Sequence, residues 1–338
     1  MSKTNQNRAG NQLLRLGAVW GVLLGLLFIT FLLSIAIGSA RYSLSEVWNA
    51  LWNESAGKVR VTVLYLRLPR AVLALLVGSS LSAAGALLQA VMRNPLADPG
   101  TIGVSAGAGA AAITILLIFP GLSYSVPLFA FIGAAAACVL IYLLAWKDGV
   151  DPVRIILSGV AVNSVLGGYN AFLQLQNSDN LSGVLAFMNG SLSGGNWTKA
   201  SVCAVYASIG LFLAFLSIRN ANALQLGDEM AKNLGIRVNL SRIVLSAISA
   251  FLAAATVVGM IGFVGLCAPH ISRMLVGSDY KAMLPTSVLT GALMVLAADT
   301  LGRSLIPGTE IPVGVMMSVC GGPFFLYMLR KRGKFNGT

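Results

Sequence analysis

Few residues in this sequence have the chemistry of a catalytic or metal site. The chain has one histidine, His270, and four cysteines, which all lie inside apolar stretches without metal-ligand spacing. No nucleophile stands beside a base, so an intramembrane enzyme is poorly supported. We predict no catalytic residue, no metal site and buried free thiols.

The sequence contains two Gly-Lys pairs, a feature of phosphate-binding loops. Such a loop needs Ser or Thr directly after the lysine. Neither Gly57-Lys58 nor Gly333-Lys334 is followed by one. We therefore expect that this chain binds no cofactor and does not hydrolyse ATP itself.

The remaining chemistry lies in charged residues at the ends of apolar stretches. Asp299 and Arg303 are four residues apart and can pair along one helix face, which is the role we prefer for Asp299. Arg67 and Arg70 open an apolar stretch and are typical of cations that reach for lipid headgroups. An ion-coupled secondary transporter would need acidic or histidine relays near mid-bilayer. Only Asp299 and His270 come close, and both lie near predicted helix ends, where His270 is best explained as a packed or capping residue.

Composition points to a membrane protein. Of the 338 residues, 57% are hydrophobic and 10% are charged, whereas soluble domains have about 25% charged residues. The apolar stretches are continuous and long enough to cross a bilayer as helices, unlike the alternating strands of a β-barrel. The fold class predicted is an all-α membrane protein with about ten transmembrane helices. The expected helices cover residues 17–39, 67–91, 101–118, 126–146, 153–175, 198–218, 242–258, 263–276, 282–302 and 311–329.

The distribution of basic residues predicts the orientation. With ten helices and an inside N-terminus, sixteen of the 23 lysines and arginines fall in cytoplasmic segments and seven outside, as the positive-inside rule requires. This explains the net charge of +12 without a nucleic-acid partner. We expect a cytoplasmic tail over residues 1–16, one transmembrane domain over 17–329 with a cytoplasmic loop at 219–241, and a cytoplasmic tail over 330–338. The first helix is read as retained, not as a removed signal peptide.

Small residues and two long loops complete this outline. The pairs Gly21 with Gly25 and Gly103 with Gly107 have a spacing that allows close helix contact. The outside segment 41–66 carries two tryptophans and suits an interfacial amphipathic stretch. The outside segment 176–197 is rich in Asn, Ser and Gly and could form a short helix.

The cytoplasmic loop contains a sequence typical of a short capped helix. Acidic residues at 228 and 229 favour a helix N-terminus, and Gly235 can end the helix in a left-handed conformation. Met230 and Leu234 would present one apolar edge. So short a helix needs a surface to pack on. It is either a connector lying on its own bundle or a coupling helix inserted into a partner ATPase. The predicted coupling residues are Gly227, Asp228, Glu229, Met230, Ala231, Leu234 and Gly235.

This loop and several further stretches resemble the iron-siderophore and cobalamin permease family, the ten-helix permeases of type II ABC importers. The matching stretches occur in the family's order over residues 67 to 329. Cys267 stands where a branched aliphatic residue is common, a small departure. The stretches are Arg67 to Arg70, Gly85 to Gln89, Asn94 to Gly100 with Gly103 and Gly107, Gly262 to Arg273, Ala298 to Arg303, Glu310 to Gly314 and Gly321 to Phe325.

The resemblance also implies roles for particular residues. Arginines matching Arg67, Arg70 and Arg303 meet acidic residues of a substrate-binding protein, and such exposed ion pairs set orientation more than affinity. Two Asx-Pro steps break the helix after residue 93, which gives either a re-entrant turn at the inner mouth of a pathway or a plain tight turn. The polar residues of the fifth helix either border the pathway or bond between helices. The predicted pathway and inner-mouth residues are Gln89, Asn94, Pro95, Asp98, Pro99, Gly100, Asn163, Asn170 and Gln174.

Taken together, the resemblance implies a permease subunit of an ATP-driven importer in the bacterial cytoplasmic membrane, with iron(III)-siderophore as the cargo. Haem and cobalamin permeases share these motifs and remain alternatives. A bare metal ion is disfavoured, because the pathway residues carry no metal ligands. The implied partners are ATPase subunits that hold ATP and Mg, an extracytoplasmic substrate-binding protein, the lipid bilayer, and a second permease that is either the same chain or a different one.

Overall fold

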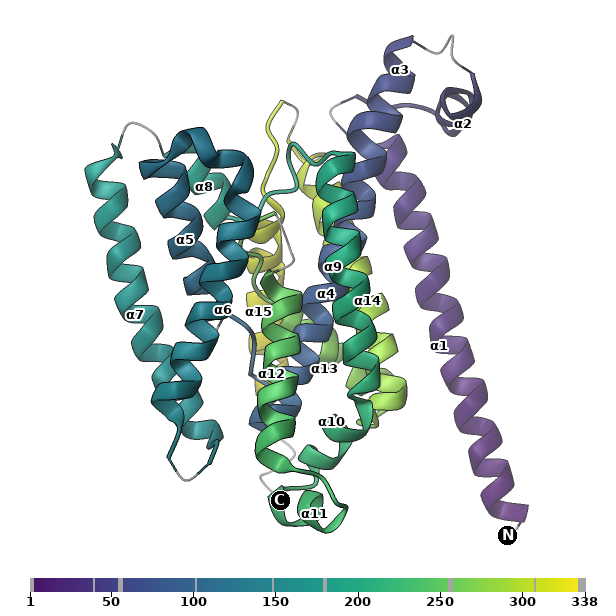
Figure 1. Ribbon diagram of the computed structural model, residues 1–338. Coiled ribbons are helices and arrows are strands. Elements are labelled where there is room, and N and C mark those ends of the chain that lie inside the picture. The colour runs from purple at the N-terminus through teal and green to yellow at the C-terminus, as the bar shows by residue number, and fades with distance from the viewer. Residues whose placement is uncertain are drawn as a thin grey trace.

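The computed structural model describes residues 3–38, 40–53, 57–100, 102–147, 149–178, 181–254, 258–306 and 308–333. Its described residues form helices joined by short turns (Figure 1). In chain order these are α1 (Lys3–Ala36), α2 (Leu44–Trp52), α3 (Gly57–Val61), η2 (Thr62–Arg67), α4 (Leu68–Met92), α5 (Val104–Ile118), η3 (Pro120–Ser125), α6 (Val126–Ala145), α7 (Pro152–Gln176), α8 (Ser182–Met188), α9 (Trp197–Leu216), α10 (Ile218–Gln225), α11 (Asp228–Asn233), α12 (Val238–Ala254), α13 (Val264–Val276), α14 (Tyr280–Gly302) and α15 (Val313–Gly333).

Helix α4 forms the centre of the bundle. It packs against α9, α12, α13 and α14, and its most apolar window is 78% buried. Glycines allow this packing: a Cβ on Gly78 would lie 2.2 Å from the carbonyl oxygen of Gly291, and one on Gly85 would lie 1.9 Å from that of Gly265. Without a hydrophobic effect between helices in lipid, such close backbone approach stabilises the core.

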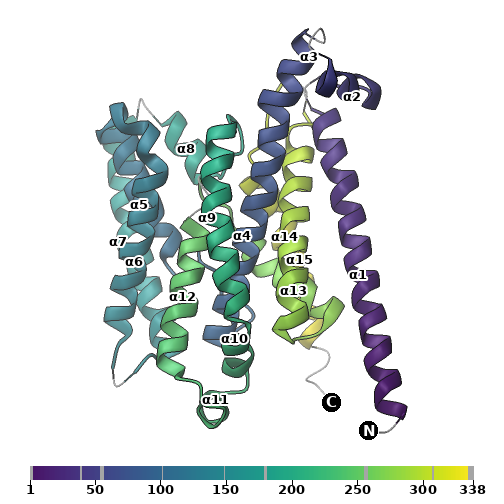
Figure 2. The ribbon, with the colours of Figure 1, turned by 45° about the vertical axis from the view of Figure 1, so that its right-hand side comes forward.

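Helices α5, α6 and α7 form a second group beside this centre (Figures 1 and 2). Here α5 meets α6 at Gly107 and Gly133, where a Cβ on either residue would lie 2.3 Å from the other's carbonyl oxygen. The predicted close contact therefore exists at Gly107. It does not exist within this chain at Gly21 and Gly25, where a Cβ would meet nothing within 4 Å. Spacing alone cannot reveal whether a neighbouring helix lies opposite.

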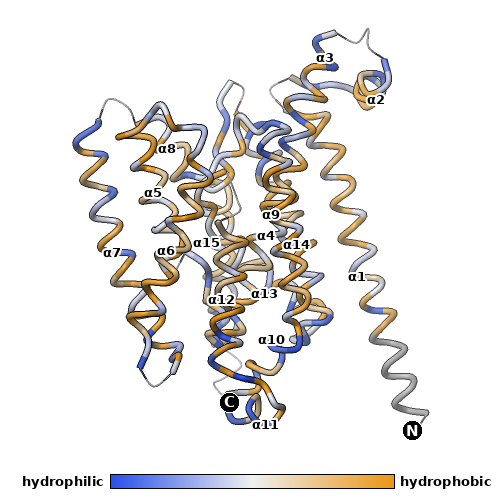
Figure 3. Tube along the Cα trace, in the orientation of Figure 1, coloured by the Kyte–Doolittle hydropathy of each residue, from blue (hydrophilic) through white to orange (hydrophobic). Residues whose placement is uncertain are grey.

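The outer helices present apolar side chains away from the core. In the most apolar 18-residue stretches of α1 and α7, only 17% and 22% of the residues are buried. Figure 3 shows hydrophobic residues along both helices. Six helical stretches among the described residues are long and apolar enough to span a membrane, and α5, α12, α13 and the apolar part of α15 are shorter. Apolar surface of this extent is stable only in lipid or against partner subunits.

Each of the ten expected ranges overlaps a helix, but some boundaries differ. The first helix begins at Lys3 and so includes most of the segment predicted as a tail. The last continues to Gly333, into the predicted C-terminal tail, of which residues 334–338 lie outside the described residues. The loop at 219–241 is largely helical, because α10 occupies 218–225 and α12 begins at Val238, four residues before its expected start. The predicted helix boundaries differ because the prediction relied on apolar runs, and these helix ends are rich in polar residues.

The two long loops predicted to lie outside also contain helices. In α2, Ser43 forms a capping box with Glu46, and Trp48 and Trp52 are 66% and 73% exposed. The segment 176–197 contains the short helix α8. Residues 179 and 180 of this segment lie outside the described residues.

Candidate functional site

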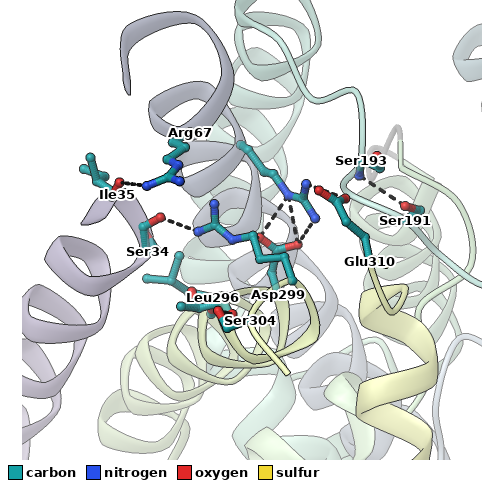
Figure 4. Close-up of polar contacts among 12 residues, drawn as sticks. Ser34, Ile35, Arg67, Ser191, Ser193, Leu296, Asp299, Ser304 and Glu310 are labelled. Carbon is teal, nitrogen blue, oxygen red and sulfur yellow. Dashed lines mark hydrogen bonds and ion pairs between the residues drawn. The ribbon is translucent and has the colours of Figure 1, made fainter. Parts of the chain in front are cut away.

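Arg67, Arg70 and Arg303 lie at one end of the bundle, where α1, α4 and α14 meet. Arg67 ends the π-helical turn η2, Arg70 lies in the first turn of α4, and Arg303 follows α14. Figure 4 shows Arg67 beside Ile35 at the end of α1, and Asp299 between this end and Glu310. Single π-turns are frequent at functional sites, because they shift the side chains that follow them.

Arg70 is held by two carboxylates. Its Nε and Nη2 donate to Asp299 at 2.9 to 3.1 Å, and its Nη1 donates to Glu310 at 2.8 Å. Asp299 is almost fully buried, and its side chain also lies 3.6 Å from Nε of Arg303. The predicted pairing of Asp299 with Arg303 is therefore confirmed.

Arg67 and Arg303 bind the end of α1. Arg67 donates to the carbonyl oxygens of Ile35 and Ala36 at 2.8 Å, and Arg303 donates to that of Ser34. The last carbonyls of a helix lack intrahelical partners and carry partial negative charge, so a cation there is favourable. These bonds fasten α1 to the bundle.

This arrangement corrects the expectation that the arginines lie exposed. Arg67 and Arg303 are 4% and 6% exposed, and the side chain of Arg70 is 11% exposed. Most of their hydrogen-bonding contacts are with groups of the same chain. The sequence could not show this, because Asp299 lies 229 residues from Arg70.

Glu310 is the residue of this cluster that sequence reasoning did not single out. Its side chain is 43% exposed, the most accessible in the cluster's ion pairs. Partial burial raises its pKa, but the hydrogen bond and the charge of Arg70 outweigh this, so the pKa of Glu310 lies below its ordinary value. Its place in a matching stretch twelve residues after Ala298 was the only signal in the sequence.

At the opposite end of the bundle, α11 has the predicted geometry (Figure 1). Gly227 and Gly235 have φ of +97° and +76° and flank the helix, so the expected left-handed end at Gly235 is confirmed. Met230 and Leu234 are 54% and 51% exposed, whereas Ala231 is fully buried. The short helix thus presents an apolar edge that its own bundle does not cover.

Asp228 has a partner within the chain besides its place in the first turn of α11. Its Oδ1 accepts a hydrogen bond from Nη2 of the buried Arg242 at 2.8 Å, and Arg93 lies 4.0 Å away. Glu229, one residue on, belongs to the first turn of α11 as expected. The ion pair links α11 to the first turns of α12.

Residues 93–100 form the predicted turn after α4. Arg93 adopts a left-handed conformation with φ of +48° and ends α4. Asn94 Oδ1 accepts from the backbone N–H of Leu96 at 2.9 Å, and Asp98 Oδ1 accepts from that of Gly100 at 2.8 Å. These Asx turns complete the break that the two following prolines, Pro95 and Pro99, begin.

Some of the predicted pathway residues contact this turn and others do not. Asn163 Nδ2 donates to the carbonyl of Gly100 at 3.3 Å. Gln89 connects α4 to α13, because its Nε2 donates to the carbonyl of Gly265 and its Oε1 accepts from Arg273. Asn170 and Gln174 lie further along α7, where Gln174 donates to the carbonyl of Asn170 at 3.1 Å. The nine residues therefore do not form one cluster.

The described residues contain no group of three or more His, Cys, Asp or Glu side chains able to hold a metal ion. All four cysteines are free, and only Cys320 is exposed.

The membrane-length helices, their glycine-packed core and the apolar short helix at one end define a polytopic membrane protein. Comparison with known proteins narrows this class. The model of the FecCD transport family matches residues 26–331. The chain belongs to the FecCD transport family, whose members are permease subunits of ABC importers.

Individual relatives match over nearly their whole length. The Fe(3+)-citrate import system permease protein YfmE of Bacillus subtilis is 39% identical, with 91% of this chain and 93% of the relative covered. The hemin transport system permease protein HmuU of Yersinia pestis is 38% identical, with 94% and 98% covered. A solved structure of a transporter assigned to the metal-chelate type of ABC transporters, in an inward-facing conformation, has a TM-score of 0.81 and 31% identity, with 94% and 99% covered.

Proposed function

We propose that this chain is the permease subunit of an ABC importer that moves iron(III)-siderophore complexes across the bacterial cytoplasmic membrane. The observation that carries the proposal is the family match over residues 26–331, together with relatives named for iron-citrate, iron-hydroxamate and siderophore transport. Both termini face the cytoplasm, as the excess of basic residues on that side favours.

ATP drives transport through separate ATPase subunits, which hold ATP and Mg. The coupling surface is α11, where Met230 and Leu234 fit an apolar cleft of the ATPase and Asp228 passes its motion to α12 through Arg242. An apolar helix edge laid into a groove is a common mode of recognition. A substrate-binding protein delivers the cargo to the outer face.

The binding protein docks on the outer cluster, which consists of Arg67, Arg70, Asp299, Arg303 and Glu310. Arg67, Arg70 and Arg303 outnumber the two carboxylates of Asp299 and Glu310, so this face keeps one net positive charge, which favours acidic residues on the binding protein. The substrate passes along an interface with a second permease and leaves past the turn at 94–100. The polar residues of α7, Asn163, Asn170 and Gln174, border this path.

Haem is the second candidate cargo. A hemin transport permease is 38% identical, about as similar as the iron-citrate permease. Apart from Asp98, the pathway residues are small, apolar or amide-bearing, and they do not by themselves separate one iron chelate from another.

Uptake of labelled ferric citrate, ferric hydroxamate, haemin and cobalamin by a strain lacking this chain tests the proposal. We expect loss of ferric-chelate uptake, restored by the wild-type chain but not by a Met230→Asp/Leu234→Asp double variant present at normal membrane levels. The control, Asn233→Asp, adds a charge to α11 but leaves both apolar side chains in place, and it should restore uptake. Loss of cobalamin uptake alone would contradict the cargo. Uptake that survives removal of the ATPase but stops when the ion gradient collapses would favour an ion-coupled carrier.

A further inference from the structure

A basic cavity of about 640 Å³ lies beside α11, and of its charged lining residues only Asp228 and Arg242 have a role above. It is lined by the ends of four elements: the turn after α4, the loop between α6 and α7, α11, and the start of α12. Its charged residues are five cations and two carboxylates, so the lining has a net charge of +3. The cations are Arg93, Lys147, Lys232, Arg237 and Arg242.

The two carboxylates already have partners. Asp151 caps α7 by accepting from the backbone N–H groups of Val153 and Arg154 at 2.8 and 3.1 Å. Asp228 accepts from Arg242. By contrast, the side chains of Lys147, Lys232 and Arg237 make no hydrogen bond or ion pair within the part of the chain that the structure describes. Their charge is therefore available to a ligand.

The wall of the cavity also contains donors that lack partners. Arg242 is 3% exposed, and its Nε is buried without a hydrogen-bond partner among the described residues. Helix α12 begins at Val238 on the same wall, and its first backbone N–H groups have no intrahelical acceptor. Guanidinium groups and a helix N-terminus together favour a phosphate group.

The surroundings indicate which source of phosphate fits. Leu143 and Leu144, in the last turn of α6, are 69% and 60% exposed, and Leu240 in the cavity wall is 51% exposed. Trp146, next to Lys147, is 54% exposed, as is common where a helix leaves the membrane. Acyl chains could follow these apolar side chains while the headgroup enters the cavity. Among the described lining residues none is aromatic, so nothing there would stack on a nucleotide base.

We propose that this cavity binds the phosphate headgroup of an anionic phospholipid from the leaflet on the α11 side of the membrane. Basic pockets between transmembrane helices on the cytoplasmic side are suited to such headgroups. Because Arg242 also holds Asp228, a bound headgroup stabilises the position of α11 relative to α12. The proposal depends on the cytoplasmic orientation given above and not on the cargo.

The test measures lipid binding to the purified full chain, alone and with its ATPase. Phosphatidylcholine nanodiscs with and without phosphatidylglycerol are compared, and co-purified lipids are counted by native mass spectrometry. We expect a preference for phosphatidylglycerol that a Lys147→Gln/Arg237→Gln variant loses. Each cation near an anionic lipid contributes about fivefold, so the affinity should fall roughly 25-fold. Arg15→Gln/Arg219→Gln removes two basic residues from the same side outside the cavity and should keep the preference.

Three results would overturn the proposal. The first is an unchanged preference for phosphatidylglycerol in the Lys147→Gln/Arg237→Gln variant, with a thermal unfolding transition that shows the variant to be folded. The second is displacement of phosphatidylglycerol by inorganic phosphate or ATP, which would identify a site for soluble phosphate. The third is unchanged lipid binding with lost ATPase assembly, which would assign the cations to that partner. Lys147→Arg/Arg237→Lys keeps both charges and should restore binding if the ligand is anionic.

Discussion

At the scale of single residues, the carboxylate of Asp299 stabilises the outer cluster. It is the buried counter-charge of both Arg70 and Arg303, at 2.9 and 3.6 Å. Asp299→Asn leaves two largely buried cations without this charge, and breaking a buried pair costs roughly 3 to 5 kcal/mol. We expect a marked fall in the melting temperature of the detergent-purified chain.

Glu310→Gln is the matched control for this prediction. It also removes one carboxylate from Arg70, but Glu310 is 43% exposed, and exposed pairs contribute at most about 1 kcal/mol. Equal melting temperatures for the two variants would show that burial of Asp299 does not stabilise the cluster.

At the scale of elements, the contact between α4 and α14 depends on a missing side chain. A Cβ on Gly78 would lie 2.2 Å from the carbonyl oxygen of Gly291, a backbone atom that cannot rotate away. Gly78→Ala must therefore move one helix, and overpacking of this kind costs about 1 to 3 kcal/mol or more. We expect less folded protein on size-exclusion chromatography and a lower melting temperature.

Gly25→Ala in α1 is the corresponding control, because a Cβ there meets nothing within 4 Å of this chain. It should change the melting temperature little. A comparable loss in both variants would contradict the packing argument, and it would indicate that α1 has a close neighbour from another subunit.

At the scale of the whole molecule, the charge bias predicts which side of the membrane each end of the bundle faces. In a Cys320→Ser background, Glu46→Cys in α2 should react with a membrane-impermeant maleimide added to intact cells. Lys232→Cys in α11 should react only after permeabilisation, because most basic residues stay in the cytoplasm. The reverse pattern would overturn both the orientation and the proposed lipid leaflet. Background labelling should be low, since Cys138, Cys203 and Cys267 are not exposed.

Much of this architecture could be predicted because it depends on short-range features. Continuous apolar stretches must become helices in lipid, since every backbone group needs an internal partner. The turn after α4 follows from Asn94-Pro95 and Asp98-Pro99. The start of α11 follows from Asp228 and Glu229, and its end follows from Gly235. Helices with polar sequences, such as α10, escaped a prediction based on apolar runs.

The sequence by itself determined the class of fold, the apolar edge of α11 and the pairing of Asp299 with Arg303, which are four residues apart. Only the tertiary structure decided what Arg67 and Arg70 contact, because their partners lie on α1 and α14, far away in the chain. It likewise decided that Gly107 has a close neighbour and Gly25 has none in this chain. It also brought the cations of four separate elements to one cavity. Residue types and spacing determine what each segment can do, but burial and partners depend on which segments meet.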